Sequence, residues 1–278
     1  MDYDMLVLDL DGTTLNGAGE LRPVDIAAAR ALTEHGVHVT IATGRLFTGT
    51  QWVAQELGVT GGVAVMNGNE ILDAHTAATH HGRYVKPAER ALAQEIFEDL
   101  DLASPVLFGS RRIHFRERDA HLRDWLSIWT PDLSTHRDVF DADEWSNADD
   151  IVAIGVLGKD DAIRQAQARL LDASAGGLQS VVFRTDLGDT FLKFRHQGDD
   201  KGTALAKMAH ERGTTTERTI AVGDWLNDLP MLMRAGHSFA MAHSDPRVID
   251  AAKETLRSER HAGGAVAEVA ERIWGITP

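Results

Sequence analysis

Short apolar runs alternate with amphipathic stretches along the first part of the chain. Three runs predict buried strands: "MLVL" (5–8), "VHVTIA" (37–42) and "GVAVM" (62–66). Two stretches with helical spacing separate them, one over residues 23–36 that begins with a proline and ends at a glycine, and one over residues 46–57. "NGNEILDA" (67–74) then has the composition of a hairpin turn. Strand and helix units of this kind predict a parallel sheet.

The pattern changes near His80, where helical stretches begin to mix with adjacent strand pairs. Helices are predicted at "PAERALAQEIFEDL" (87–100), "RDAHLRDWLSIWT" (118–130) and "DDAIRQAQARLLDA" (160–173). Strands are predicted at "SPVLFG" (104–109), "RRIHF" (111–115), "IVAIGVLG" (151–158), "LQSVVFRT" (178–185) and "TFLKFR" (190–195). This mixture favours an α+β domain on a mostly antiparallel sheet.

After "HQGDD" (196–200) the alternation of strands and helices returns. The predicted elements are a helix from Lys201 to Arg212, the strand "TIAVGD", a helix through "DLPMLMRAG", the strand "SFAMA", a helix that opens with Asp245 and Pro246, and a last helix "AVAEVAERIWG". We therefore expect an α/β fold in which residues 1–80 and 196–278 form a Rossmann-like parallel-sheet core. Residues 81–195 are expected to form an inserted α+β cap domain.

The composition fits a globular protein with a large core, since 43% of the 278 residues are hydrophobic and 25% are charged. A net charge of -14 repels phosphate backbones and anionic lipid, so we expect neither nucleic acid nor a membrane as partner. The absence of cysteine excludes disulfides and thiol nucleophiles. Apolar runs are short, and the acidic start "MDYDM" lacks the basic region of a signal peptide, which predicts a cytoplasmic location. The oligomeric state is not indicated.

Polar residues follow four of the predicted strands of the core. They are Asp9 and Asp11 after the first strand, Thr43, Gly44 and Arg45 after the second, Asn67 after the third, and Asp224, Asn227 and Asp228 after "TIAV". In any one segment, such residues are explained equally well as turn or helix-capping residues. Ligands of open α/β sheets bind outside the carboxyl ends of the strands. The four segments together therefore predict one site at one rim.

The acidic residues of this rim require a counter-charge. Two unit charges about 4 Å apart repel by roughly 4 kcal/mol at an effective dielectric constant near 20. Asp9, Asp11, Asp224 and Asp228 therefore cannot share a pocket as bare anions, and either protons or a cation must be present. Oxygen ligands with open positions for water and phosphate favour Mg²⁺, and no EF-hand spacing is present.

A phosphate that joins this cation needs hydrogen-bond donors. Thr43 offers a hydroxyl, and the backbone amides of Leu10 and Gly44 are expected to be free where strands turn into loops. Lys201 lies at the start of a helix, where a solvated surface lysine is the alternative interpretation. Gly12 would let the backbone turn sharply beside the ligand.

Four segments resemble, in order, motifs one to four of the haloacid dehalogenase superfamily. They are "DLDGT" (9–13), "ATGR" (42–45), "DKGTAL" (200–205) and "VGDWLNDLPML" (222–232). The large insertion, "NGNEI" (67–71) and "FAMAHSDPRVIDAAK" (239–253) resemble the Cof-type sugar-phosphatase branch. The resemblance covers more than half of the chain. The cap corresponds only in position and size.

The resemblance implies a role for each matching residue. Asp9 would be the nucleophile that forms an aspartyl-phosphate, and Asp11 would protonate the leaving alkoxide and later activate water. Thr43 and Lys201 would hold the phosphoryl oxygens, with Asn227 near them, beside the Leu10 and Gly44 amides expected above. Mg²⁺ would be bound by the Asp9 side chain, the Asp11 main-chain carbonyl and Asp224, with Asp228 supporting that shell. Gly12, Asn67 and Arg45 are expected to support the site. Acidic neighbours would favour the protonated form of Asp11 that acts as an acid.

Three positions depart from the family pattern. Thr14 precedes the aliphatic residue that usually follows "DGT", Trp225 replaces a small or polar residue and is expected to pack beside the site, and Lys193 stands where relatives often have glutamate near the cap hinge. The polar clusters of the cap are Arg111, Arg112 and His114, and Arg184 and Asp186. Solvated strand ends are the favoured interpretation of both clusters, and contacts to the organic part of a substrate are the alternative.

The sequence as a whole predicts a Mg²⁺-dependent phosphatase that acts on a small phosphomonoester, with a sugar phosphate as the expected substrate. Two alternatives stay open. A phosphotransferase or mutase would pass the same phosphoryl group to a sugar hydroxyl. A receiver-like signalling module would be phosphorylated without turnover, although the inserted domain and the paired acids of "DLDGT" argue against it.

Overall fold

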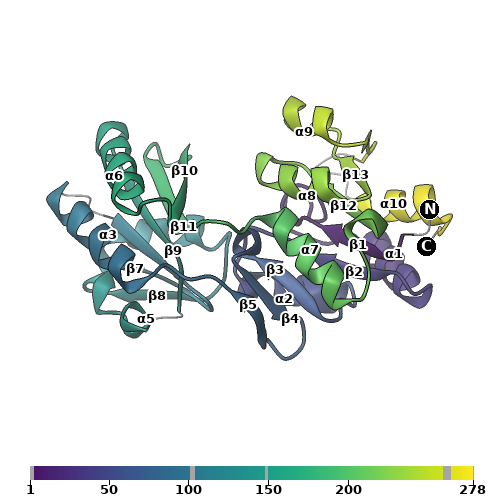
Figure 1. Ribbon diagram of the computed structural model, residues 1–278, viewed down its shortest axis with the longest axis horizontal. Helices are drawn as coiled ribbons and strands as arrows, with labels where there is room; N and C mark the ends of the chain where they lie inside the picture. Colours follow the sequence, from purple (N-terminus) through teal and green to yellow (C-terminus); the bar gives the residue numbers. More distant parts are fainter. Residues whose placement is uncertain (1–2, 101–103, 148–149, 259–263, 278) are drawn as a thin grey trace. The chain divides into compact units, whose positions relative to one another are not determined.

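The computed structural model describes residues 3–100, 104–147, 150–258 and 264–277, so Met1 and Asp2 of the acidic start lie outside the described residues. The chain separates into two compact units, coloured by sequence in Figure 1. The first unit comprises Met1–Arg45, Thr50–His81 and Asp199–Pro278. The second comprises Leu46–Gly49 and Gly82–Gly198.

The first unit is built on a parallel sheet with the strand order β14-β13-β12-β1-β2. Its strands are β1 (Met5–Leu8), β2 (His38–Ile41), β12 (Thr219–Gly223), β13 (His237–Ala240) and β14 (Glu254–Thr255). Every residue of β1 and β12 is buried, as expected for parallel strands covered on both faces. The predicted α/β class is confirmed.

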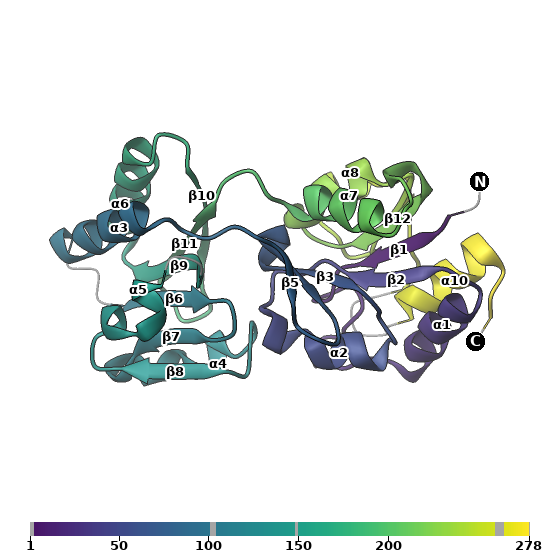
Figure 2. The ribbon, with the colours of Figure 1, turned by 60° about the horizontal axis from the view of Figure 1, so that its bottom comes forward.

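Helices cover both faces of this sheet. Figure 2 shows α7 (Lys201–Glu211) and α8 (Leu229–Arg234) on one side of the strands, and α1 (Pro23–Glu34) and α10 (Ala265–Trp274) on the other. The remaining helices of the unit are α2 (Gln51–Glu56) and α9 (Pro246–Ala251). Proline is the first residue of α1 and α9 and the second residue of α8, where it has no amide hydrogen to leave unpaired, which favours the helix start seen there.

A small sheet of β3 (Gly62–Val65), β4 (Glu70–Asp73) and β5 (Thr79–Gly82) continues the first unit beyond β2. β3 runs parallel to the end of β2 through the pairing of Ala42 with Ala64. β3 and β4 form an antiparallel hairpin whose turn, η2, spans Met66–Gly68. The predicted hairpin is therefore confirmed, and its turn lies beside the end of β2.

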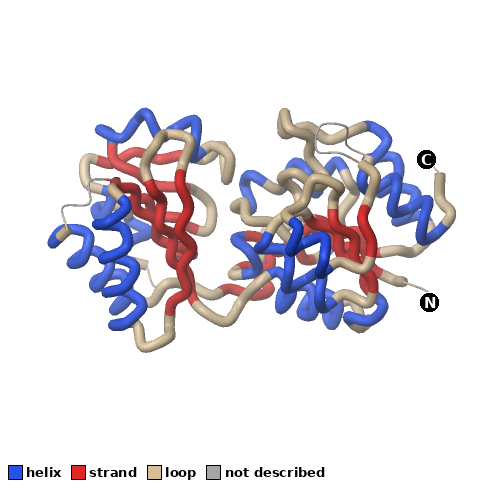
Figure 3. The backbone as a smooth tube through the Cα atoms, turned by 90° about the horizontal axis from the view of Figure 1, so that it is seen from above, coloured by secondary structure: helices blue, strands red, loops and turns tan. Residues whose placement is uncertain are grey.

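The second unit is a mostly antiparallel sheet with the order β10-β11-β9-β6-β7-β8, in which only β7 and β8 run parallel among the described strands. The strands are β6 (Ser104–Gly109), β7 (Ile113–Arg116), β8 (Leu133–His136), β9 (Ile151–Gly158), β10 (Leu178–Arg184) and β11 (Thr190–His196). The helices are α3 (Pro87–Asp99), α4 (Arg123–Leu126), α5 (Asp143–Ser146) and α6 (Asp160–Ala173). Figure 3 shows the strands of each unit gathered into sheets of their own.

The two faces of this second sheet differ. One face packs on α3 and α6 through buried aliphatic side chains such as Leu107, Ile154 and Leu192. Residues of alternating position, such as Phe108 and Phe191, point to the other face and meet Trp125 and Trp129. The second face is therefore aromatic.

The domain bounds differ from those predicted. The chain crosses between the units after His81 and after Gly198 rather than at residues 80/81 and 195/196. The predicted helix over 46–57 is interrupted at Thr50, because Leu46–Gly49 belongs to the second unit. There the Leu46 amide donates to the Trp129 carbonyl (3.0 Å), and the Thr48 hydroxyl donates to the Arg111 carbonyl (2.9 Å).

Two further expectations for the second unit need correction. The predicted helix over 118–130 is a 3₁₀ turn, η3 (Glu117–Leu122), followed by the single turn of α4. Lys193 is not at a hinge, because it lies in the middle of β11 and is buried on the aromatic face. The local periodicity predicted this strand correctly, but it could not predict which residues surround the side chain of Lys193.

Candidate active site

Asp9 is the first residue after β1, and the ends of two neighbouring strands hold it. Its amide donates to the carbonyl of Val222 at the end of β12 (3.0 Å), and its own carbonyl accepts from the Thr14 hydroxyl (2.6 Å). Only 5% of Asp9 is exposed. Thr14, which departs from the family pattern, therefore fixes the backbone of Asp9.

Lys201 opens α7 and is fully buried, so it is not a solvated surface lysine. Asp200 caps this helix by accepting from the Thr203 amide (2.7 Å). The Lys201 Nζ lies 2.5 Å from Asp9 Oδ1 and 2.6 Å from Asp228 Oδ1. Burial disfavours the charged amine, but Asp228 and Asp9 outweigh it and raise the pKa of Lys201. Lys201 is thus a charged bridge between two carboxylates.

The turn after β12 wraps around the carboxylate of Asp228. Asp228 Oδ2 accepts from the amides of Asp224 (2.9 Å) and Trp225 (3.0 Å). A Cβ atom at Gly223 would lie 2.5 Å from Asp228 Cγ, so only glycine allows this close approach. Asp228 therefore holds Lys201 with one oxygen and the loop that carries Asp224 with the other.

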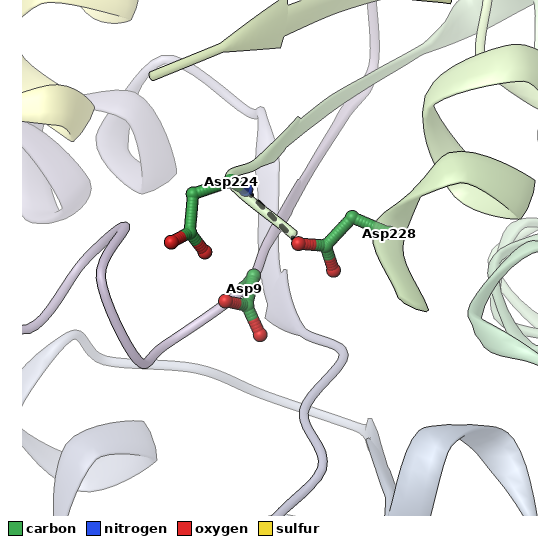
Figure 4. Close-up of side chains that lie close together, drawn as sticks. All are labelled: Asp9, Asp224 and Asp228. Atoms are coloured by element: carbon green, nitrogen blue, oxygen red, sulfur yellow. Dashed lines mark hydrogen bonds between the residues drawn. The ribbon is translucent and has the colours of Figure 1, made fainter. Parts of the chain in front are cut away.

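Carboxylate oxygens of Asp9, Asp224 and Asp228 lie within 4.8 Å of one another, and Figure 4 shows the three side chains together. Burial and the charge of Asp228 raise the pKa of Asp9 well above its usual range, and the same two causes raise the pKa of Asp224. Lys201 alone does not balance three carboxylates. This surplus of clustered, buried oxygen ligands fits a hard divalent cation such as Mg²⁺.

Gly12 lies against this cluster with a left-handed backbone, at a φ of +84°. A Cβ atom there would come within 2.4 Å of Asp224 Oδ2, so a side chain would displace the carboxylate. The Thr13 hydroxyl donates to the other oxygen, Asp224 Oδ1 (3.2 Å). The loop from Asp9 to Thr13 therefore sets the position of Asp224, which comes from a strand more than two hundred residues away.

Asp11 does not join the acidic cluster. The chain leaves the strand after Leu8, Leu10 is buried, and the Asp11 side chain is 46% exposed. Its carboxylate forms a two-point pair with Arg45, from Nη2 to Oδ1 (2.5 Å) and from Nε to Oδ2 (2.9 Å). The expectation that acidic neighbours surround Asp11 is therefore wrong, because its charged partner is a guanidinium.

The predicted phosphate donors follow three neighbouring strands, with Leu10 after β1, Thr43 and Gly44 after β2, and Asn227 after β12. The side chain of Thr43 is buried, and its hydroxyl accepts from the Arg45 amide (3.2 Å), which leaves its hydrogen free to donate. Within the described part of the chain, the amides of Leu10 and Gly44 donate to no residue. Asn227 donates from Nδ2 to Asn67 Oδ1 (2.8 Å). These groups resemble the donor set that an anion requires.

Two residues beside the cluster differ from the expectation or were missed. Trp225 was expected to pack beside the site, but it is 57% exposed and is therefore not a buried packing residue. His243 was not singled out, yet its Nε2 lies 3.5 Å from Asp224 Oδ2. The only sequence signal for His243 was its place in "FAMAHSDPRVIDAAK", the segment that follows β13.

The polar clusters of the second unit have mixed surroundings. Arg112, Arg184 and Asp186 are exposed, as the solvated interpretation expects. His114 is only 1% exposed and lies 3.0 Å from His136, with Glu144 near its other nitrogen. Arg111 is half-buried, with its guanidinium over the ring of Phe47. The solvated interpretation is therefore wrong for His114.

The sequence profile of the haloacid dehalogenase-like hydrolases matches residues 6–269, which is nearly the whole chain. The chain belongs to this family. The predicted resemblance, including that to the Cof-type branch, is thereby confirmed. Within the described residues, no helix of this hydrolase is long and apolar enough to cross a membrane.

Curated relatives of this hydrolase are phosphatases. It is 25% identical to the 5-amino-6-(5-phospho-D-ribitylamino)uracil phosphatase YcsE of Bacillus subtilis, over 92% of this chain and 88% of the relative. It is also 25% identical to the HMP-PP phosphatase of Yersinia pseudotuberculosis, over 88% of this chain and 86% of the relative. Together with the family match, these relatives support a phosphoric monoester hydrolase, as the sequence predicted.

Solved structures share the fold. A haloacid dehalogenase-like hydrolase from Bacteroides thetaiotaomicron superposes with a TM-score of 0.81 at 24% identity, over 98% of this chain and 100% of that chain. A HAD/COF-like hydrolase from Plasmodium vivax superposes with a TM-score of 0.77 at 19% identity, over 99% of this chain and 96% of that chain. The arrangement of sheets described above is therefore that of the family.

Proposed function

We propose that this hydrolase is a Mg²⁺-dependent phosphatase that cleaves a small phosphomonoester through an aspartyl-phosphate on Asp9. The observation that carries the proposal is the buried cluster in which Lys201 bridges Asp9 and Asp228 while Asp224 lies alongside. A carboxylate nucleophile, a fixed cation and free backbone amides are the groups that phosphoryl transfer requires.

Mg²⁺ would be held by the carboxylates of Asp9 and Asp224 and by the main-chain carbonyl of Asp11, with Asp228 supporting that shell. This set fits the raised pKa values of Asp9 and Asp224, which reflect burial and mutual repulsion without enough positive charge. When bound, the ion would neutralise charge that develops on the phosphoryl oxygens.

In the first step, a carboxylate oxygen of Asp9 attacks phosphorus, and the bond from phosphorus to the leaving oxygen breaks. Asp11 gives its proton to the leaving alkoxide, so the alcohol departs neutral. Lys201, the Thr43 hydroxyl and the amides of Leu10 and Gly44 stabilise the phosphoryl oxygens.

In the second step, water attacks phosphorus, and the bond from phosphorus to the Asp9 oxygen breaks. Asp11 takes the proton from that water and returns to its acid form. The products are the free alcohol and inorganic phosphate. The Asp11 side chain is 46% exposed, and protonation of Asp11 removes its charge attraction to Arg45, so the pair can open when Asp11 carries the proton.

The substrate class is proposed to be a phosphorylated sugar or sugar-derived alcohol. The relatives from Bacillus subtilis are named for a phospho-D-ribitylamino compound, in which the phosphate is on a sugar-derived chain. We also propose that the protein acts without nucleic acid or membrane, as its net charge of -14 favours, and that it is cytoplasmic.

A panel of phosphate esters assayed with Mg²⁺ and with EDTA tests this function. We expect phosphate release with Mg²⁺ that EDTA abolishes. Asp9→Asn, which keeps the shape of the side chain, should lower kcat by on the order of 10³-fold or more. Asp172→Asn on the exposed face of α6 is the matched control and should leave kcat unchanged. Full activity of Asp9→Asn would exclude the covalent mechanism.

Product analysis separates the alternatives. A mutase or phosphotransferase would move the phosphoryl group to a sugar hydroxyl with little release of inorganic phosphate. A signalling module would give a stable phosphorylated Asp9 with no turnover. Release of one phosphate for each ester consumed, with oxygen from labelled water in the phosphate, supports the phosphatase alone.

A further inference from the structure

Three successive residues of the hairpin turn between β3 and β4 have a left-handed backbone. Their φ angles are 47° at Met66, 57° at Asn67 and 92° at Gly68. Glycine adopts this conformation freely and asparagine tolerates it, but it is strained for a buried methionine. Strained turns of this kind persist only where the surrounding structure holds them.

The backbone of this turn holds the loop after β2. The Asn67 amide donates to the Thr43 carbonyl (2.8 Å), and the Met66 amide donates to the Arg45 carbonyl (2.9 Å). The two bonds lie on either side of Gly44, whose own amide is free among the described residues. The turn therefore fixes the direction in which the Gly44 amide points.

The side chain of Asn67 also contacts the turn that follows β12. Its Oδ1 accepts from Asn227 Nδ2 (2.8 Å), in the turn that follows β12. A Cβ atom built on Gly44 would lie 3.5 Å from the same Oδ1, so the Asn67 amide lies directly over the Gly44 loop. At Gly68, a Cβ atom would lie 2.5 Å from the Asp200 carbonyl, so the turn also abuts the start of α7, which carries Lys201.

We propose that Asn67 is a positioning residue for phosphoryl transfer, which aligns Asn227 and the Gly44 amide with the phosphoryl group held at Asp9. This inference rests on the proposed phosphatase function. An amide donor aids a transition state only when its direction is fixed beforehand. Asparagine tolerates the left-handed backbone and offers a neutral acceptor for Asn227. Glycine would adopt the same backbone but has no acceptor, and aspartate would place a negative charge beside the phosphate.

A double-mutant cycle tests the proposal. Asn67→Gly keeps the left-handed backbone accessible and removes only the side chain, and Asn227→Ala removes its partner. We expect Asn67→Gly to lower kcat/KM for p-nitrophenyl phosphate by about 10-fold to 100-fold. Asn67→Gly retains the backbone hydrogen bonds that hold the loop of Gly44, so the effect of losing the side chain runs through Asn227. The double variant should therefore be no slower than Asn227→Ala alone.

Ala77→Gly is the matched control, since Ala77 has a φ of 58° in the neighbouring turn between β4 and β5. It makes the same kind of backbone change and should leave kcat/KM unchanged. Multiplicative effects in the double variant, or an Asn67→Gly variant as fast as the wild type, would overturn the proposal. An unchanged circular dichroism spectrum and melting temperature would show that each variant is folded.

The outcome for Asn67 is separable from that of the proposed function. If the wild type hydrolyses no ester, the proposed function fails. The wild type, Asn67→Gly, Asn227→Ala and the double variant are then titrated calorimetrically with inorganic phosphate in the presence of Mg²⁺. Asn67→Gly should then weaken phosphate binding, and the double variant should bind no more weakly than Asn227→Ala alone. Multiplicative losses, or an Asn67→Gly variant that binds phosphate as the wild type does, would reject the positioning role there too.

Discussion

Among the residues that the structure describes, each unit buries one lysine, and the two lysines have opposite surroundings. Lys201 in the first unit is fully buried, with Asp9 and Asp228 at 2.5 Å and 2.6 Å. Lys193 in the second unit is 6% exposed, and its Nζ lies 5.4 Å from the ring centre of Phe108 and 5.5 Å from that of Trp129. No carboxylate among the described residues pairs with it.

The comparison shows that partners decide the direction in which the pKa of a buried amine shifts. Burial lowers the pKa of both, but two carboxylates reverse the effect at Lys201 and raise its pKa. At Lys193, burial and, to a lesser extent, the charge of Arg195 lower the pKa to about 8. Ring faces stabilise an ammonium far less than a carboxylate does. We therefore expect Lys201 to contribute to the site and Lys193 to lower the stability of the fold.

The largest effect is expected on removing the paired lysine. Lys201→Met leaves Asp9 and Asp228 buried without a cation, which should lower stability by about 3 to 5 kcal/mol. The substitution also removes the positive charge that would stabilise the phosphoryl oxygens, so kcat should fall by on the order of 10²-fold to 10³-fold. Urea unfolding and steady-state kinetics measure the two effects.

The control for this variant is Lys207→Met. Lys207 pairs with Asp199 but its side chain is 35% exposed, so the change should cost no more than about 1 kcal/mol and leave kcat unchanged. Equal losses of unfolding free energy in the two variants would show that the buried ion pairs of Lys201 stabilise the fold no more than the more exposed pair of Lys207 does.

Removing the unpaired lysine should have the opposite sign. Lys193→Met keeps most of the length of the side chain and places no charge against Phe108 and Trp129. The melting temperature should therefore rise, and the free energy of unfolding should increase by about 1 to 3 kcal/mol. Thermal unfolding at pH 7 measures it. A clear loss of stability would mean that the contacts of the ammonium with the rings outweigh the cost of burying it.

The pH dependence of stability sharpens the contrast. The pKa of Lys193 is about 8 in the folded protein and near its ordinary value of 10.5 in the unfolded chain. Between these values the unfolded chain binds one more proton, so stability rises with pH, by up to about 3 kcal/mol. Subtracting the curve of Lys193→Met from that of the wild type isolates this slope. A flat difference between pH 8 and pH 10 would contradict the assignment.

The smallest effect is expected on giving Lys193 a partner. Val181 lies opposite Lys193 in the register of β10 and β11 and is 46% exposed. Val181→Glu should place a carboxylate near the amine, raise the pKa of Lys193 and change stability by about 0.2 to 1 kcal/mol. Slower acylation of Lys193 at pH 8, followed by mass spectrometry, would report the raised pKa, and Val181→Gln controls for the size of the side chain.

Much of the fold follows from local pattern. The buried run at Met5–Leu8 and the helical spacing of Pro23–Glu34 predicted β1 and α1 closely, because burial on both faces of a parallel sheet leaves a continuous apolar run. The helix over residues 46–57 was predicted wrongly at its start. Its first four residues pack in the second unit, and periodicity within one segment carries no information on which unit covers it.

For the site, the sequence by itself determined which residues gather at one rim, since parallel strands end at the same edge and Asp9, Thr43 and Asp224 each follow such an end. Only the tertiary structure decided the partners. Asp11 turned to Arg45 rather than to the acids, and Lys201 reached Asp9 across 192 positions of sequence. The physical reason is range: strand patterning is local, whereas the charge that a side chain meets depends on loops brought together from distant parts of the chain.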